Sequence, residues 1–284
     1  MSSENGTILI TGCSSGIGHE TARHLASSGW RVYATARRPD SIEDLAQAGC
    51  ETLALDVTDE ESMGAAVRSV TEAEGHIDAL VNNAGYSQSG AVESVPLDSV
   101  RRQFETNVFG LIRMCQLVLP GMREAGGGRI VNISSMGGKL VFPGGGIYHA
   151  TKHAVEAISD ALRFEVAGFG VKVVCIEPGL IKTKFGDAAV GSIAGDLDVE
   201  GPYAKFNQHV ARTTAGAYEE GPLAKLGAGP DAVAKAIERA LTAKRPRPRY
   251  TVTPSAKLAL TQRRLVSDRA WDRIMSTQFP RPGG

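Results

Sequence analysis

The sequence has few cysteines and no long hydrophobic run. Among its 284 residues the only cysteines are Cys13, Cys50, Cys115 and Cys175, with no Cys-x-x-Cys spacing. This scatter argues against a disulfide framework or a metal site and predicts reduced thiols. No apolar run approaches the roughly 20 residues that a membrane-spanning helix needs. The opening segment MSSENGTILITG has no basic region before an apolar one, so we expect no signal peptide and a cytoplasmic location.

The sequence also lacks an excess of charge of either sign. Lys and Arg number 31 and Asp and Glu number 31, which gives a formal net charge of zero. A nucleic-acid-binding protein usually carries a basic excess, so we expect no nucleic-acid partner. The hydrophobic share of 42% is typical of a soluble globular protein. The length allows two small domains or one large α/β unit.

What the sequence does contain is an alternation of short apolar runs with longer segments of helical period. We expect helices near 16–28, 40–48, 59–74 and 97–124, and another from Tyr148. Several of the short runs are apolar throughout, as in parallel strands buried on both faces. The pattern predicts an α/β fold, a single Rossmann-like doubly wound domain over residues 1–254 with a mostly parallel seven-stranded sheet. The predicted strands are residues 7–11, 31–36, 52–57, 77–82, 129–134, 171–177 and 249–252.

Two regions depart from this alternation. Residues 183–228 lack a strong period and are rich in glycine, so we expect a long loop that forms a substrate lid. Residues 255–284 mix leucines and Trp271 with arginines. They predict a helical extension that packs on the domain or on a neighbouring subunit, in preference to a nucleic-acid-binding segment.

A glycine-rich loop, TGCSSGIG at 11–18, lies between the first predicted strand and the first predicted helix. Glycines at this point allow a tight turn and let the backbone approach a pyrophosphate at the helix N-terminus. A purely structural turn would also explain them, but the position in a first βαβ unit favours a dinucleotide site. The residues expected to contact the cofactor here are Gly12, Ser14, Ser15, Gly16, Ile17 and Gly18.

The end of the second predicted strand indicates which dinucleotide binds. Ala36 stands where an NAD site would place an acidic residue, and Arg37 and Arg38 follow it. Guanidinium groups suit a ribose 2′-phosphate, so the sequence favours NADP(H), although adjacent loop arginines can also be merely solvated. Asp56, with Val57 beside it, is a candidate acceptor for the adenine amino group at the end of the third strand.

Six motifs in one order resemble the short-chain dehydrogenase/reductase family over about residues 5–185. They are TGCSSGIG, NNAG (82–85), Asn107, NISS (132–135), YHATK (148–152) and EPG (177–179). The finer pattern resembles the 17β-hydroxysteroid and retinol dehydrogenase branch. The resemblance implies NADPH-dependent reduction of a carbonyl without a metal. It also implies a homodimer or homotetramer that pairs through the helices near 97–124 and 148–168.

The resemblance assigns Tyr148 as the general acid/base. Lys152, one helical turn away, would lower the phenol's pKa from its ordinary value of about 10 and bind the nicotinamide ribose. Ser135, thirteen residues before Tyr148, would hydrogen-bond the carbonyl oxygen, with Ser134 as the alternative. Asn107 would hold a water that relays protons to Lys152. The further cofactor contacts implied are Asn83, Ala84, Gly85, Pro178, Gly179, Ile181 and Thr183.

We expect a mostly apolar substrate pocket, which favours a lipophilic ketone, aldehyde or alcohol. His149 and His153 are either polar substrate contacts or ordinary helix-surface residues, and the second interpretation is favoured. A 3-oxoacyl-thioester reductase and a non-catalytic dinucleotide-sensing protein are the rival functions. The expected pocket walls are Tyr86, Met136, Leu140, Val141, Phe142, His149 and Leu180, with Tyr203 and Phe206 from the lid.

Overall fold

The centre of the computed structural model, which describes residues 5–183, 201–219 and 226–283, is a seven-stranded sheet. Its strand order is β3-β2-β1-β4-β5-β6-β7, and every neighbouring pair is parallel. The predicted α/β fold is therefore confirmed, with a sheet that is fully parallel. The strands are β1 Thr7–Ile10, β2 Arg31–Ala36, β3 Glu51–Ala54, β4 Ala79–Asn82, β5 Gly128–Ile133, β6 Val171–Glu177 and β7 Arg249–Thr251.

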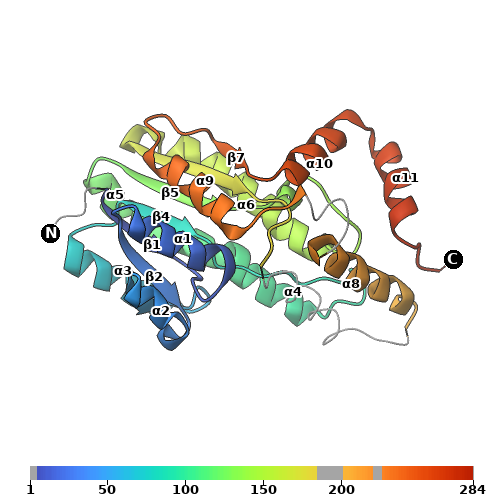
Figure 1. Ribbon diagram of the computed structural model, residues 1–284, viewed down its shortest axis with the longest axis horizontal. Helices are drawn as coiled ribbons and strands as arrows, with labels where there is room; N and C mark the ends of the chain where they lie inside the picture. Colours follow the sequence, from blue (N-terminus) through green and yellow to red (C-terminus); the bar gives the residue numbers. More distant parts are fainter. Residues whose placement is uncertain (1–4, 184–200, 220–225, 284) are drawn as a thin grey trace.

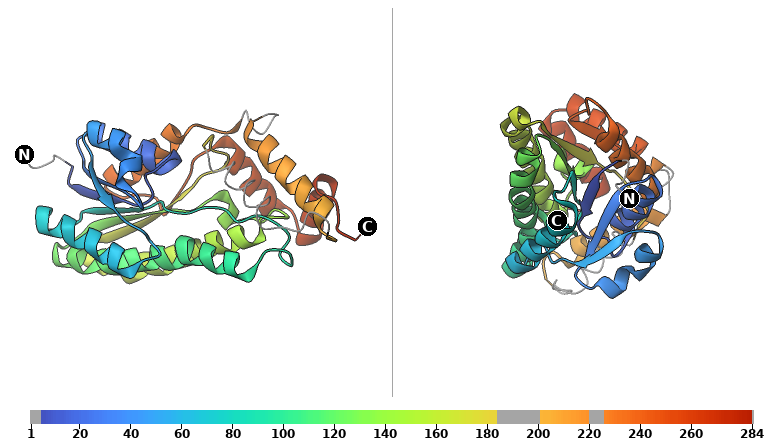
Figure 2. Two further views of the ribbon diagram at one scale, coloured as in Figure 1. Left: turned by 90° about the horizontal axis from the view of Figure 1, so that it is seen from below. Right: turned by 90° about the vertical axis from the view of Figure 1, so that its left-hand side faces the viewer.

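Helices cover both faces of the sheet (Figures 1 and 2). One face packs against α1 (Gly16–Ser27), α2 (Glu43–Gln47) and α9 (Pro230–Thr242), and the other against α3 (Glu60–Glu74), α5 (Gly110–Glu124) and α6 (Gly146–Glu165). Side chains alternate between the faces of a strand. In β1, Ile8 and Ile10 accordingly join the first core and Leu9 the second. Burial on both faces explains the uninterrupted apolar strands.

The strand order changes direction between β1 and β4. The chain runs outward from β1 to β2 and β3, then returns to place β4 on the other side of β1. The loops that follow β1 and β4 therefore diverge, and a crevice opens at the carboxyl ends of these strands. This is where a doubly wound sheet binds its ligand.

The predicted helix over 97–124 is interrupted. It consists of α4 (Leu97–Phe104), a π-helical turn η2 (Glu105–Phe109) and α5. Single π turns often occur at functional sites because they redirect one side chain. A second difference concerns α9, which was not among the predicted helices. Its signals are Pro230 in the first turn and the spacing of Val233, Ala236 and Ile237.

The segment expected to be an irregular lid contains a helix. Residues Ala204–Glu219 form α8, so the prediction of a loop across 183–228 is wrong for this part. Residues 184–200 and 220–225 of the expected lid lie outside the described residues.

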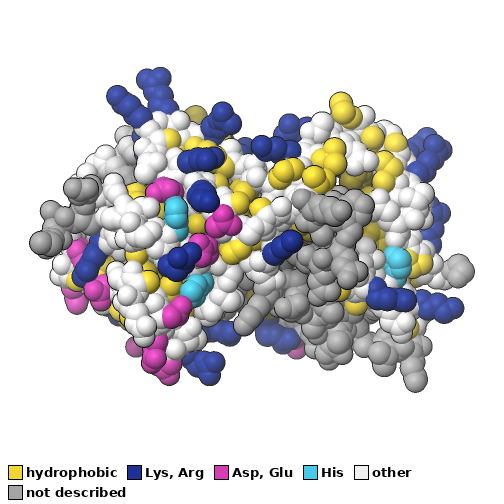
Figure 3. Space-filling view, in the orientation of Figure 1, with side chains coloured by type: hydrophobic (Ala, Val, Ile, Leu, Met, Phe, Trp, Pro, Cys, Tyr) yellow, Lys and Arg dark blue, Asp and Glu magenta, His cyan; other side chains and the backbone are white. Residues whose placement is uncertain are grey.

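The C-terminal extension is helical, as predicted. It forms α10 (Pro254–Leu265) and α11 (Asp268–Gln278), which begin after Thr253 and Ser267, each accepting a capping hydrogen bond from a backbone amide. Hydrophobic side chains are visible on the surface around α10 (Figure 3), and Leu265 is 81% exposed. None of the helices within the described ranges combines the length and the apolar character that a membrane span requires.

Candidate active site

A cavity of about 1110 Å³ lies at the carboxyl ends of the strands. One end is bordered by the loop between β1 and α1, and the other by α8, α10 and α11, which lie together beyond the sheet (Figure 1). The volume slightly exceeds the usual range of roughly 300–1,000 Å³ for small-molecule sites. It is therefore large enough for two ligands side by side.

The backbone of the glycine loop packs closely against the NNAG segment that follows β4. Gly12 has φ +73°, and a β-carbon there would lie 2.8 Å from the Cα of Ala84. A β-carbon on Gly18 would collide with the side chain of Asn83 and the carbonyl of Gly12. The Asn83 amide donates hydrogen bonds to the carbonyl oxygens of Thr11 (3.0 Å) and Gly12 (2.9 Å). This packing holds the loop against the NNAG segment.

The N-terminus of α1 faces the cavity. Ser14, Ser15, Gly16 and Ile17 line it, and Ser15 at the N-cap makes no side-chain capping bond within the described residues. The first amides of the helix are therefore left for a ligand, and they favour an anion. Together with the close-packed glycines, this arrangement fits the pyrophosphate of a dinucleotide.

The predicted cofactor residues that follow β2 and β3 divide into two groups. Arg37, Asp56 and Val57 line the cavity, whereas Arg38 is not among the described lining residues, although both arginines are exposed. Gly18 of the glycine loop is likewise absent from the described lining. Asp56 Oδ1 accepts hydrogen bonds from the amide (2.9 Å) and hydroxyl (2.7 Å) of Thr58. Arg37 forms no ion pair with any residue in the described ranges. Its guanidinium group is thus available to an anionic ligand.

The opposite wall comes from the segment after β6. Pro178, Gly179, Ile181 and Thr183 line the cavity, as do Asn83, Ala84 and Gly85 after β4. A β-carbon placed on Gly16 would lie 3.4 Å from the side chain of Thr183. Thr183 therefore lies across the crevice from the start of α1. This position is compatible with the predicted contact between Thr183 and the cofactor.

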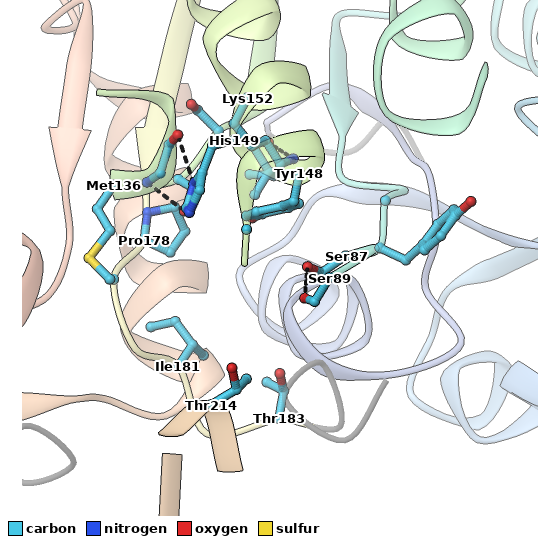
Figure 4. Close-up of a pocket in the computed structure, with 18 of the residues that line it drawn as sticks. Ser87, Ser89, Met136, Tyr148, His149, Lys152, Pro178, Ile181, Thr183 and Thr214 are labelled. Atoms are coloured by element: carbon cyan, nitrogen blue, oxygen red, sulfur yellow. Dashed lines mark hydrogen bonds between the residues drawn. The ribbon is translucent and has the colours of Figure 1, made fainter. Parts of the chain in front are cut away.

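Tyr148 and Lys152 lie one turn apart on α6 and both line the cavity (Figure 4). The ammonium nitrogen of Lys152 is 5.9 Å from the centroid of the Tyr148 ring and donates to the carbonyl of Ile133 at 2.8 Å. Burial lowers the pKa of Lys152 to about 8. At neutral pH the Lys152 side chain is thus a protonated, largely desolvated cation beside the phenol. Its charge favours the phenolate form of Tyr148 more strongly in this buried place than it would in water.

Both candidate serines border the cavity but in different ways. Ser135 is half-buried, and its Oγ accepts a hydrogen bond from the amide of Gly137 at 3.0 Å. The Ser135 hydroxyl proton therefore remains available to an acceptor in the cavity. Ser134 is 2% exposed, and its Oγ has no partner in the described structure. The geometry suits Ser135 better to contact a ligand.

Asn107 lies behind the cavity wall instead of lining it. Its Oδ1 accepts from the amide of Tyr86 at 3.1 Å, and its Nδ2 donates to the carbonyl of Tyr86 at 2.9 Å and to Thr151 Oγ1 at 3.1 Å. The side chain thus ties the chain after β4 to α6. The π-helical turn directs it inward, which explains an asparagine inside a helix. Its role in holding a water stays a prediction.

His149 differs from the favoured expectation of a surface residue. It is 7% exposed, lines the cavity and contacts the carbonyl of Gly137 through Nδ1 at 3.1 Å. Burial lowers its pKa to about 4. The interpretation failed because the loop of Gly137 packs over this side of α6, which helical period alone does not reveal. His153, one turn further, is exposed as expected.

The expected substrate walls are partly corrected. Tyr86, Met136, Phe142 and Leu180 line the cavity. Other predicted residues are not among its described lining. Leu140 is buried in the protein and Val141 is 45% exposed.

The two aromatic residues expected from the lid also lie outside the lining. The Tyr203 hydroxyl donates to Glu93 at 2.6 Å, and Phe206 packs with Ala91 and Val210 in a small core of its own. These contacts occupy both side chains outside the described lining, although Val210 itself borders the cavity. The contacts of Tyr203 with Glu93 and of Phe206 with Ala91 each join segments more than a hundred residues apart. The local sequence pattern does not reveal such contacts.

The sequence did not predict that the C-terminal helices would wall the cavity. The spacing of Trp271, Ile274 and Met275 signals an amphipathic helix, but not what its apolar face contacts. The lining residues that these helices add are Val210, Thr213 and Thr214 from α8 and Ser255, Leu258, Ala259, Gln262, Trp271, Ile274, Met275, Gln278 and Phe279 from the extension.

Comparison with known proteins identifies the family. A sequence model of the family described as short chain dehydrogenase matches residues 6–191. This chain belongs to the short-chain dehydrogenase family. It is similar to the uncharacterized oxidoreductase YbbO of Escherichia coli (strain K12), with 35% identity over 270 residues that cover 95% of this chain and 93% of the relative.

Two further similarities extend over nearly the whole chain. The NADPH-dependent 3-dehydrocapnine reductase of Ornithobacterium rhinotracheale is 34% identical over 277 residues, or 94% of each chain. The crystal structure of a short-chain dehydrogenase from Streptomyces avermitilis matches with a TM-score of 0.81 and 36% identity, covering 98% of this chain and 96% of that one. The short-chain dehydrogenase family resemblance is thus confirmed, and with it an oxidoreductase acting on CH–OH or C=O groups. The finer branch stays a prediction.

Proposed function

We propose that this protein is an NADP(H)-dependent oxidoreductase that reduces a lipophilic ketone or aldehyde to an alcohol. The observation that carries the proposal is one continuous cavity with two chemically different ends. The glycine loop and Arg37 border one end, Trp271 and Met275 border the other, and Tyr148 lies in the same cavity. Such an arrangement suits a dinucleotide meeting an apolar substrate at the phenol.

The choice of NADP(H) rests on the end of β2. Ala36 supplies no carboxylate there, and the Arg37 side chain lines the cavity without an ion pair in the described part of the chain. A guanidinium group can hold a 2′-phosphate through charge-assisted hydrogen bonds. The relative from Ornithobacterium rhinotracheale is named as NADPH-dependent, which agrees with this choice.

The bound nicotinamide would supply the hydride, and the chain's own residues would handle the proton. Ser135 donates a hydrogen bond to the substrate oxygen, and Tyr148 delivers its proton to that oxygen as charge develops there. Lys152 remains protonated below its pKa of about 8, so its charge stabilises the phenolate left on Tyr148. Asn107 keeps the wall opposite α6 in place.

The proposal of a lipophilic substrate is supported by apolar residues in the lining beyond Tyr148. Phe142, Leu180, Trp271, Ile274 and Met275 face this part of the cavity. Apolar walls of this kind bind by removing apolar ligand surface from water, at roughly 25 cal/mol per Å². A long or ring-containing carbonyl compound therefore fits better than a small polar one.

We also propose a homodimer or homotetramer, placed in the cytoplasm. Phe109 and Phe164 are 52% and 87% exposed beside α5 and on α6, and Leu97 at the start of α4 is 59% exposed. Large apolar side chains gathered on neighbouring helices are typical of subunit interfaces. Size-exclusion chromatography with light scattering should give the mass of two or four chains, and Phe164→Glu should lower it.

A direct test compares the wild type with Tyr148→Phe in NADPH oxidation with a panel of lipophilic ketones and aldehydes. We expect turnover by the wild type and a loss of about 10²–10⁴-fold in the variant, since only the general acid is removed. NADPH binding, followed by its fluorescence, should be retained in both. If both proteins bind NADPH and neither consumes it with any carbonyl, the function is dinucleotide sensing. Preferred turnover of 3-oxoacyl thioesters would instead support the rival reductase.

A further inference from the structure

The imidazole of His149 is seated between two glycines beside the reacting phenol. A β-carbon at Gly137 would overlap the His149 Nδ1, and one at Gly145 would lie 2.6 Å from Nε2. The ring centroid is 5.6 Å from that of Tyr148 and 6.0 Å from that of Phe142. Gly137, Gly145, Phe142 and Tyr148 also line the cavity, and Figure 4 shows the His149 ring beside Tyr148. The ring is therefore held in one place at the cavity wall.

The contacts of the ring also fix its tautomer. Nδ1 lies 3.1 Å from the carbonyl of Gly137, which can only accept, so Nδ1 carries the hydrogen. The ring is neutral at physiological pH because burial lowers its pKa to about 4. In a neutral imidazole protonated at Nδ1, the other nitrogen is an acceptor. His149 Nε2 is thus a fixed hydrogen-bond acceptor.

Within the described part of the chain, this acceptor has no partner. No hydrogen bond to Nε2 of His149 occurs there, although the residue is 7% exposed and its ring lines the cavity. A buried acceptor that stays unpaired when a ligand displaces water costs about 1–3 kcal/mol. A ligand that supplies a donor at this point avoids that loss, and a ligand that lacks one does not.

We propose that His149 selects carbonyl substrates that carry a hydroxyl or amino group close to the reacting carbonyl. The inference rests on the proposed function, because it takes Tyr148 as the group that protonates the carbonyl oxygen. The centroids of the Tyr148 and His149 rings are 5.6 Å apart and both residues line the cavity, so a donor that reaches Nε2 belongs to an atom near the carbonyl carbon. The remainder of the substrate lies along Phe142 and Trp271, whose rings are 6.2 Å apart. The substrate class is a lipophilic hydroxy ketone or amino ketone.

The test uses three ketones of equal alkyl length: hexyl methyl ketone, its α-hydroxy derivative and its α-methoxy derivative. The methoxy compound keeps the electron withdrawal of the hydroxyl compound but has no donor. We expect the wild type to favour the hydroxy over the methoxy ketone by about tenfold or more in kcat/KM, the range of one lost hydrogen bond to a buried group. In His149→Leu this ratio should fall to near one.

Two further variants separate recognition from folding. His153→Leu removes the exposed histidine one turn away and should keep the wild-type ratio. His149→Gln retains an acceptor oxygen on a side chain of similar reach and should keep part of the preference. Circular dichroism and NADPH binding identify any variant that has not folded.

The outcomes distinguish the two proposals. Turnover of all three ketones with no preference for the hydroxy compound, or an equal preference in His149→Leu, overturns the role of His149 and leaves the proposed function standing. Failure of the wild type to reduce any carbonyl overturns both.

Discussion

The indole nitrogen of Trp271 donates a hydrogen bond to the carbonyl oxygen of Val141 at 3.3 Å, across 130 positions of the chain. The Trp271 ring lies 6.2 Å from Phe142, which in turn lies 6.0 Å from His149, the neighbour of Tyr148. A continuous row of rings thus joins the last helix to the candidate general acid. The C-terminal extension is therefore part of the cavity wall that leads to the candidate general acid.

Truncating this indole should weaken substrate binding without changing nucleotide binding. In Trp271→Ala we expect kcat/KM for a lipophilic ketone to fall about tenfold or more, since one large apolar contact is lost. The dissociation constant of NADPH should change less than about twofold because the glycine loop is at the other end of the cavity. Leu265→Ala, on an 81% exposed side chain of the same extension, is the control. Equal kinetics in the two variants would contradict a substrate wall on α11.

Removing the Arg37 guanidinium should change the cofactor preference. In Arg37→Ala we expect kcat/KM for NADPH to fall about 10–100-fold, the range of a lost charge-assisted hydrogen bond. The value for NADH should stay nearly constant because NADH has no 2′-phosphate. Steady-state kinetics of the wild type and Arg37→Ala give kcat/KM for NADPH and for NADH and so measure the change in preference.

The variant Arg38→Ala tests which of the two guanidinium groups binds the 2′-phosphate of NADPH. Both arginines are exposed, but only Arg37 lines the cavity, so the loss of kcat/KM for NADPH should be smaller in Arg38→Ala than in Arg37→Ala. A larger loss in Arg38→Ala would reverse the assignment.

Replacing Lys152 should stabilise the nucleotide-free protein while abolishing turnover. Burial lowers the pKa of Lys152 from 10.5 to about 8, so the folded chain binds fewer protons than the unfolded chain between these values. Wild-type stability should therefore rise with pH through this window, and the full cost of the buried ammonium is present at pH 7. In Lys152→Met, the free energy of unfolding at pH 7 should increase by about 1–3 kcal/mol, reduced by loss of the bond to Ile133.

Guanidinium chloride titrations at pH 7 and pH 10 without nucleotide measure this difference. The advantage of Lys152→Met should shrink at the higher pH, where the wild-type lysine is neutral. Lys257→Met, on an exposed side chain of α10, should stay within about 0.5 kcal/mol of the wild type. A Lys152→Met protein less stable than the wild type at both pH values would argue against a desolvated lysine.

His149 should make the protein sensitive to acid. Burial lowers its pKa from 6.5 to about 4, with a smaller contribution in the same direction from His153. The folded chain binds fewer protons in this window, so stability is lost as the pH falls from 6.5 toward 4. We expect the wild type to lose about 3 kcal/mol more than His149→Gln over this range, at about 1.36 kcal/mol per pH unit. If chemical unfolding experiments give equal losses of unfolding free energy for the wild type and His149→Gln, the pKa of the His149 imidazole is not lowered by burial.

The sequence by itself determined the sheet and much of the candidate site. Strands β2 and β6 have the predicted bounds because a strand buried on both faces leaves a continuous apolar run. The pairing of Tyr148 with Lys152 follows from one helical turn, and the glycine loop from backbone crowding that only Gly tolerates. These features depend on residues close together in the chain, which local pattern can reveal.

The tertiary structure alone decided which surfaces meet. Phe206 packs in a small core outside the described lining and Trp271 lines the cavity, although both lie in helices with apolar residues. Asn107 finds its partner at Tyr86 through a π-helical turn, and His149 is covered by the loop of Gly137. An amphipathic period shows that a helix face will be buried but not against what. That choice depends on contacts between different elements, which are 130 positions apart for Trp271 and Val141 and 12 apart for His149 and Gly137.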